Sequence, residues 1–135
     1  MLKSMLSLFG FLLFYSLSAQ PTAPSEFPGI QLGVKFTSHH TVVDYFTQET
    51  ENNKDRTKLI KYGKTNEGRP LIAIVISTSD NLKHLDEIRI NNLRNAKLIN
   101  DGVSNTLGKK SIVWLSYNVH GNETSGTEAA LNTYY

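Results

Sequence analysis

Cysteine is absent from this chain of 135 residues. Its absence excludes a fold held by disulfides, a thiolate nucleophile and a zinc site with cysteine ligands, so a metal site here must use His, Asp or Glu. An excess of either charge is also lacking, because 14 Lys and Arg residues nearly balance 12 Asp and Glu residues. With no long basic run, the sequence predicts neither nucleic acid nor an anionic membrane surface as a partner.

No apolar run reaches the length of a membrane span. The first nineteen residues, MLKSMLSLFGFLLFYSLSA, carry an early Lys3, an apolar run at 5–17 and small residues at the end. This pattern is typical of a secretory leader, which we predict for residues 1–19 with cleavage after Ser18 or Ala19. An uncleaved anchor is the alternative. We therefore expect an exported protein, periplasmic or extracellular, without stable membrane insertion after cleavage.

The residues after the leader divide into a lead-in and one folded part. Proline, serine and threonine are concentrated in residues 20–36, which predicts an extended lead-in. Residues 37–135 are assigned to a single domain, since the length allows no second one. Thr37 or Ser38 can cap the first helix of this domain. The apolar positions of that helix are Val42, Val43 and Phe46, with Tyr45 on the flank of the same face.

The middle of the chain predicts a hairpin, a helix and a third strand. Residues 58–64 and 71–77 read as strands, and TNEGRP between them supplies the turn of an antiparallel hairpin. The second run is apolar throughout, which favours a strand covered on both faces. A helix is expected from residue 82 to the following asparagines, and SIVWLSYN at 111–118 reads as a strongly apolar strand. This order predicts a layered α/β fold with a mixed sheet.

The closing segment, YNVHGNETSGTEAALNTYY, carries the best candidate for a site. His120 and Glu123 flank Gly121, which allows a sharp turn after the predicted strand. Ser125 and Glu128 have the spacing of a capping box, so a helix should begin near residue 126. In a tight loop, an imidazole nitrogen and a carboxylate oxygen three residues apart can converge on one zinc ion. The alternative is a surface histidine near a glutamate at a helix start.

Two segments together resemble the M14 family of metallocarboxypeptidases. SIVWLSYNVHGNETSGTEAAL resembles the first half of that family's zinc site, and KYGKTNEGRPLIAIVIS is similar to its hairpin. The resemblance implies the N-terminal portion of a layered mixed-sheet zinc-carboxypeptidase-like fold. It implies that His120 and Glu123 bind one Zn²⁺ ion and that peptide or protein C-termini are the substrate. Asn122 stands where pancreatic-type members carry arginine, and it is a candidate substrate-binding residue.

The rest of the family's site has no counterpart here. In the family, a third ligand (another histidine), the arginine that grips the substrate carboxylate and the glutamate base all lie farther downstream. The other histidines, His39, His40 and His84, precede the motif, so we expect the third ligand beyond residue 135 and no catalytic residue within the chain. The final helix has an apolar face but no C-terminal cap, which favours a truncated domain. The chain alone is therefore expected to be inactive and loosely folded or aggregation-prone.

The remaining polar candidates have structural interpretations. His39 and His40 are expected in a solvated first helical turn and His84 on a helix surface, rather than as ligands. Arg69 is expected to hydrogen-bond within the hairpin rather than to touch substrate. For Glu128 and Ser125 the sequence favours the helix cap over a catalytic carboxylate and a nucleophile.

Two other functions stay open beside an exported zinc carboxypeptidase. One is a non-catalytic exported module that binds peptide or metal, and the other is a related deacylase or amidase. The EGRP hairpin favours the peptidase.

Overall fold

The computed structural model describes residues 20–103 and 110–135. In chain order they form η1 (Pro24–Glu26), α1 (His39–Asn52), β1 (Thr57–Lys64), β2 (Pro70–Ile76), α2 (Ser79–Lys83), α3 (Leu85–Asn95) and α4 (Ser125–Tyr134). The α/β class is thereby confirmed. The predicted leader lies outside the described residues. Within the described ranges, no helix combines the length and the apolar character needed to cross a membrane.

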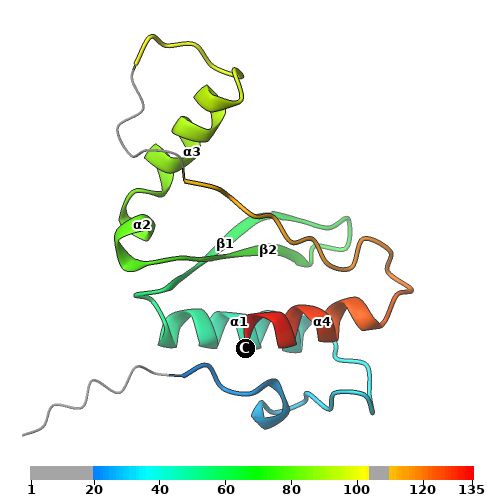
Figure 1. Cartoon of the computed structure of the whole chain (residues 1–135). Helices are drawn as coiled ribbons and strands as arrows, with labels where there is room; N and C mark the ends of the chain where they lie inside the picture. Colours follow the sequence, from blue (N-terminus) through cyan, green and yellow to red (C-terminus); the bar gives the residue numbers. More distant parts are fainter. Residues whose placement is uncertain (1–19, 104–109) are drawn as a thin grey trace, which may run out of the picture.

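The hairpin lies over two helices that run side by side. Figure 1 shows α1 and α4 beneath β1 and β2, the lead-in on the far side of these helices, and α2 and α3 extending away from them. The strands pair antiparallel from Thr57 opposite Ile76 to Lys64 opposite Pro70. At the turn, Thr65 N–H donates to the Arg69 carbonyl at 2.8 Å. The predicted hairpin is confirmed. It could be predicted because its turn and both strands are encoded in one short stretch.

β2 is only partly covered. Ile72 and Ile74 pack against the core cluster, residues 70–75 are all half-buried, and Ile76 at the end of the same face is 61% exposed. The prediction that this strand is covered on both faces is wrong for the described residues. The unbroken apolar run reports side chains suited to burial, but it does not say which elements are present to cover them.

The core joins the lead-in to both helices. Ile30, Tyr45, Phe46 and Leu131 form its buried cluster. The rings of Tyr45 and Phe46 each meet the ring of Tyr134 edge to face, and the Phe46–Tyr134 centroids lie 5.4 Å apart. Such aromatic pairs contribute beyond their buried area. Tyr45, expected on the flank of its helix, is fully buried and lies at the centre of this cluster.

The lead-in is fixed to α1 through the backbone of Thr22. Its N–H donates to Glu49 Oε2 at 2.9 Å, and its carbonyl accepts from the Tyr45 hydroxyl at 2.8 Å. Glu49 is only 1% exposed. Burial, and after it the charge of Glu49, raises the pKa of the Tyr45 phenol. The segment expected to be extended therefore contains a 3-10 turn and takes part in the core.

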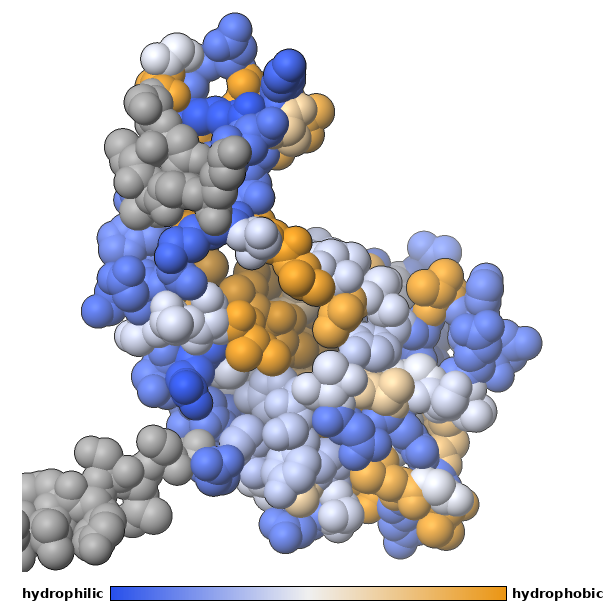
Figure 2. All heavy atoms as spheres, viewed as in Figure 1, coloured by the Kyte–Doolittle hydropathy of each residue, from blue (hydrophilic) through white to orange (hydrophobic). Residues whose placement is uncertain are grey.

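The strand predicted at residues 111–118 is not formed. β1 and β2 make up the two-stranded sheet of the described residues, and the backbone of 111–118 belongs to neither helix nor strand. Its side chains are exposed, Val113 by 80% and Trp114 by 72%. Apolar residues favour a strand only where a neighbouring backbone lies in hydrogen-bonding register, and this segment has none. Figure 2 shows apolar atoms gathered below α3, on the face where this segment passes the hairpin.

Candidate metal half-site

His120 and Glu123 lie together in the turn that precedes α4. His120 Nδ1 is 3.0 Å from Glu123 Oε1, and the two side chains are 69% and 58% exposed. The Glu123 N–H also donates to the His120 carbonyl at 3.1 Å, which closes a backbone turn between them. Since an ionised carboxylate only accepts, Nδ1 is the donor of the side-chain hydrogen bond. The turn thus brings an imidazole nitrogen and a carboxylate oxygen to one solvent-exposed point.

These two atoms fit a zinc ion in part. Tetrahedral zinc with ligand distances of about 2.0–2.2 Å places two ligand atoms roughly 3.3–3.6 Å apart. The observed 3.0 Å between Nδ1 and Oε1 is somewhat shorter than that spacing, and a small opening of the two side chains would reach it. A metal ion would take the place of the shared proton, as expected where binding releases protons. Across residues 20–103 and 110–135, however, no three His, Asp or Glu side chains gather closely enough to hold an ion.

Asn122 lies in the same turn, between the two candidate ligands in sequence. Residues 121 and 122 form the turn itself and are exposed. The Asn122 side-chain amide carries both a donor and an acceptor, which suits contact with a peptide substrate. Substrate binding by Asn122 stays a prediction.

The capping box predicted at the start of α4 is wrong. Thr124 occupies the N-cap position, and its side chain accepts no capping hydrogen bond. Glu128 instead accepts from the N–H of Gly33 in the lead-in, at 2.9 Å from Oε1. The Glu128 carboxylate, which the local spacing assigned to the helix start, thus accepts a hydrogen bond from the distant Gly33. Glu128 ties α4 to the lead-in, and this contact could not be inferred from the S-x-x-E spacing.

Asn118 was missed by the sequence reasoning, although it borders the site. Its φ of 58° lies in the left-handed region. Its Nδ2 donates to Thr127 Oγ1 in the first turns of α4 at 2.7 Å. Asparagine two residues before the histidine, with glycine and threonine at the helix start, is the signal that could have indicated it. Asparagine is among the few side chains that tolerate this backbone conformation.

The other histidines have structural partners. His39 is half-buried and its Nε2 donates to the Pro70 carbonyl at 3.0 Å, so the expected solvated position is wrong for this residue. His40 is exposed and hydrogen-bonds to Ser38. His84 Nδ1 donates to the Asp80 carbonyl at 2.9 Å. The position of His39 follows from the packing of the hairpin on α1, which a local pattern does not contain.

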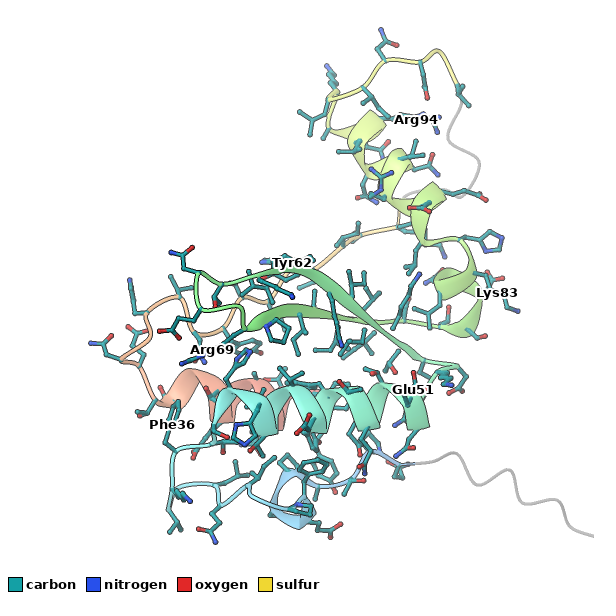
Figure 3. The ribbon with its side chains drawn as sticks, turned by 180° about the vertical axis from the view of Figure 1, so that it is seen from behind. Phe36, Glu51, Tyr62, Arg69, Lys83 and Arg94 are labelled. Atoms are coloured by element: carbon teal, nitrogen blue, oxygen red, sulfur yellow. The ribbon has the colours of Figure 1, made fainter. Side chains whose placement is uncertain are left out.

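A cavity of about 470 Å³ lies between the hairpin turn and the start of α1. Its lining includes both neighbouring histidines, Phe36 and Arg69, and Figure 3 shows Phe36 and Arg69 at the same end of the molecule. Arg69 pairs with Glu67 at 2.7 Å, and its N–H donates to Thr65 Oγ1. The structural interpretation of Arg69, hydrogen bonding within the hairpin, is confirmed.

A sequence model of the family described as zinc carboxypeptidase, Peptidase_M14, matches residues 42–135. The matched range includes α1 from residue 42 onward, the hairpin, the turn with His120 and Glu123, and α4. No curated protein and no solved structure matches the chain.

Proposed function

The chain belongs to the M14 family of zinc carboxypeptidases, and from this we propose that it contributes two zinc ligands to a metallocarboxypeptidase that removes C-terminal residues from peptides. The observation that carries the proposal is the 3.0 Å approach of His120 Nδ1 to Glu123 Oε1 inside the matched range. A neutral imidazole and a carboxylate are two of the three protein ligands of a His₂Glu catalytic zinc site. We propose that the third ligand comes from outside the described residues, because these offer no third donor nearby.

The residues of the turn bind two different ligands, the zinc ion and the peptide substrate. His120 and Glu123 hold the ion, which when bound supplies a Lewis acid that polarises a carbonyl and lowers the pKa of a coordinated water. The Asn122 amide lies in the same exposed turn, from which it would hydrogen-bond to the peptide substrate. With 69% of His120 and 58% of Glu123 exposed, solvent reaches both ligands. Elements that exclude water from the reaction must come from outside the described residues.

Zinc titration of the purified chain tests the metal role. Competition with a chromogenic chelator should show one zinc ion bound by the wild type, and the affinity should be low because two protein ligands leave an open site. His120→Ala and Glu123→Ala should each abolish measurable binding. His84→Ala is the matched control, since that partly exposed histidine lies between α2 and α3, outside the turn with His120 and Glu123. Unchanged binding in His120→Ala would remove the basis of the proposal.

A peptidase assay tests the reaction. The reading frame past the Tyr135 codon should be sequenced, and the protein that it encodes should be assayed for release of C-terminal residues from N-blocked peptides. A continuing frame with a later His, Arg and Glu, together with zinc-dependent release, supports the carboxypeptidase. Hydrolysis of acylated amines without peptide cleavage would favour the deacylase or amidase. Zinc or peptide binding without any hydrolysis would favour the non-catalytic module.

We also propose that the protein is exported. The support is the charge and hydropathy pattern of residues 1–19, which lie outside the described residues. Expression of the full chain in its source organism or a bacterial host, followed by fractionation, should place it outside the cytoplasm. N-terminal sequencing should give a chain that begins at Ala19 or Gln20. A product that retains Met1 in the cytoplasm would contradict export.

A further inference from the structure

Asn118 closes the loop that carries the two proposed ligands. The loop runs over residues 119–124, between Asn118 and the first residue of α4. From the beginning of the loop, Asn118 Nδ2 reaches across to Thr127 Oγ1 at 2.7 Å, and Thr127 is only 5% exposed. One side chain therefore connects the start of the loop to the helix that follows its end.

Gly126 makes this approach possible. A Cβ at residue 126 would lie 2.3 Å from Asn118 Oδ1 and 3.1 Å from Asn118 N. The first of these distances is shorter than real Cβ contacts allow, so the Asn118 side chain and backbone rest directly on the first turn of α4. A glycine whose missing side chain leaves room for another residue marks close packing. The hydrogen bond to Thr127 and the contact with Gly126 hold Asn118 in place from two sides.

The backbone of Asn118 gives a third sign of a fixed geometry. Its φ of 58° is left-handed, a conformation that non-glycine residues seldom adopt. Outside glycine, asparagine pays little for it because its short side chain can hydrogen-bond locally. This conformation turns the chain out of the extended segment 110–118 and into the loop. The backbone conformation of Asn118 thus sets the direction of the chain at His120, two residues later.

We infer that Asn118 is a positioning residue: it fastens the start of the 119–124 loop to Gly126 and Thr127 of α4 and thereby sets the spacing of His120 and Glu123. The inference rests on the proposed zinc function. Partners that orient metal ligands from outside the ligand set commonly affect metal affinity on the order of 10–100-fold. Asn118 acts on both ligands at once because it fixes the two ends of the loop between which they lie.

The test compares full-chain variants that break or keep this contact. Asn118→Gly removes the side chain but permits the left-handed backbone, and Thr127→Val removes the hydrogen-bonding oxygen with little change in shape. Both should weaken zinc binding on the order of 10-fold. The double variant should bind zinc no less tightly than the single variant with the lower affinity, because all three lose the same contact. Thr127→Ser keeps Oγ and should bind zinc like the wild type.

Tyr117→Phe is the matched control. Tyr117 also hydrogen-bonds to α4, but through Thr133 Oγ1 at 2.9 Å, near the other end of the helix. Its zinc affinity should be unchanged. Hydrogen exchange of the Glu123 amide, which donates to the His120 carbonyl, gives a second readout without metal. Exchange should be faster in Asn118→Gly and Thr127→Val, and unchanged in the control and in Thr127→Ser.

The outcomes distinguish the proposed zinc function from the positioning role of Asn118. If the wild type binds no zinc, the proposed function is overturned, and amide exchange alone decides the positioning role. If the wild type binds zinc but both contact-breaking variants match it in affinity and in exchange, this inference is overturned and the proposed function stands. Equal weakening in Tyr117→Phe also overturns it, because any loosened contact with α4 would then have the same effect. Far-UV circular dichroism checks that each variant keeps its helices, and Thr127→Val decides the matter if Asn118→Gly unfolds.

Discussion

Replacing Gly126 with alanine tests whether α4 and the site loop are as closely packed as the structure shows. The new Cβ would meet Asn118 Oδ1 at 2.3 Å and Asn118 N at 3.1 Å. The side chain can rotate away, but it then loses its 2.7 Å hydrogen bond to Thr127. The backbone contact remains even after that rotation, so the loop itself must shift. The substitution therefore combines a lost hydrogen bond with overpacking.

The magnitude follows from three opposing effects. A lost hydrogen bond costs about 0.5–1.5 kcal/mol, and overpacking costs about 1–3 kcal/mol. Alanine is favoured over glycine within a helix by about 0.5–1 kcal/mol. The cost exceeds the gain, and we expect Gly126→Ala to lower the free energy of unfolding by about 1–3 kcal/mol. A surface glycine in a helix would show the opposite sign.

The assay is urea unfolding followed by far-UV circular dichroism. Gly121→Ala is the matched control, because a Cβ at residue 121 meets nothing within 4 Å. Its effect should stay within about 0.5 kcal/mol, as is usual for open surface positions. The slope of the transition should be equal in all three proteins, so that the midpoints report stability alone. Gly126→Ala at or above wild-type stability would refute the close packing of Asn118 on α4.

Three further predictions concern the core and the loop after α3. Leu131→Ala, at a fully buried position, should lower the free energy of unfolding by about 2–5 kcal/mol. Val113→Ala, at a position that is 80% exposed, should change it by no more than about 0.5 kcal/mol. Equal urea midpoints for the two variants would contradict the core assignment. Tyr45→Phe leaves a lead-in carbonyl without its donor and should cost about 1–2 kcal/mol in the same assay, and an unchanged midpoint would show that the lead-in is not held there. The hydrogen bond from Arg94 lowers the pKa of Asp101 to about 2, so their pairing stabilises the fold above pH ~4 and is lost as pH falls through about 2. NMR titration of the Asp101 carboxyl should show this midpoint, and a value near 4 would contradict the pairing.

The elements with local signals were predicted correctly. The hairpin has two β-rich runs and a turn with Gly68 at a φ of 78°, all within one short stretch. Helix α1 begins directly after Ser38, the predicted cap position, although the Ser38 side chain makes no capping hydrogen bond. The second predicted helix appears as α2 and α3 and ends at Asn95, among the asparagines. Such features depend on neighbours a few residues away, and the sequence displays them directly.

The long-range features could not be read in this way. Residues 111–118 have the composition of a strand, but no strand within 20–103 and 110–135 pairs with them. Glu128 has the spacing of a cap, but its carboxylate binds Gly33, far away in the sequence. Tyr45 lies at the centre of the core because the lead-in and α4 both pack on it. Each outcome was decided by a segment that the local pattern does not contain.

The candidate site shows the same division. The approach of His120 to Glu123 follows from a short turn with Gly121, and the sequence predicted it. The residue that secures the loop, Asn118, acts through α4 and was not predicted. The family match over residues 42–135 supports the zinc carboxypeptidase assignment of the domain, and the proposals concern what this chain's own residues do within it.

The core has a consequence for the order of events during folding. Ile30 and Leu131 belong to one buried cluster, so on the order of a hundred residues must be looped before it closes. Topologies dominated by such distant contacts fold slowly. At about 5–20 residues per second, a ribosome needs roughly 3–11 s to proceed from the end of β2 to Leu131. During that interval the hairpin and α1 exist without the helix that completes their shared core, so the apolar side chains that Leu131 covers stay exposed.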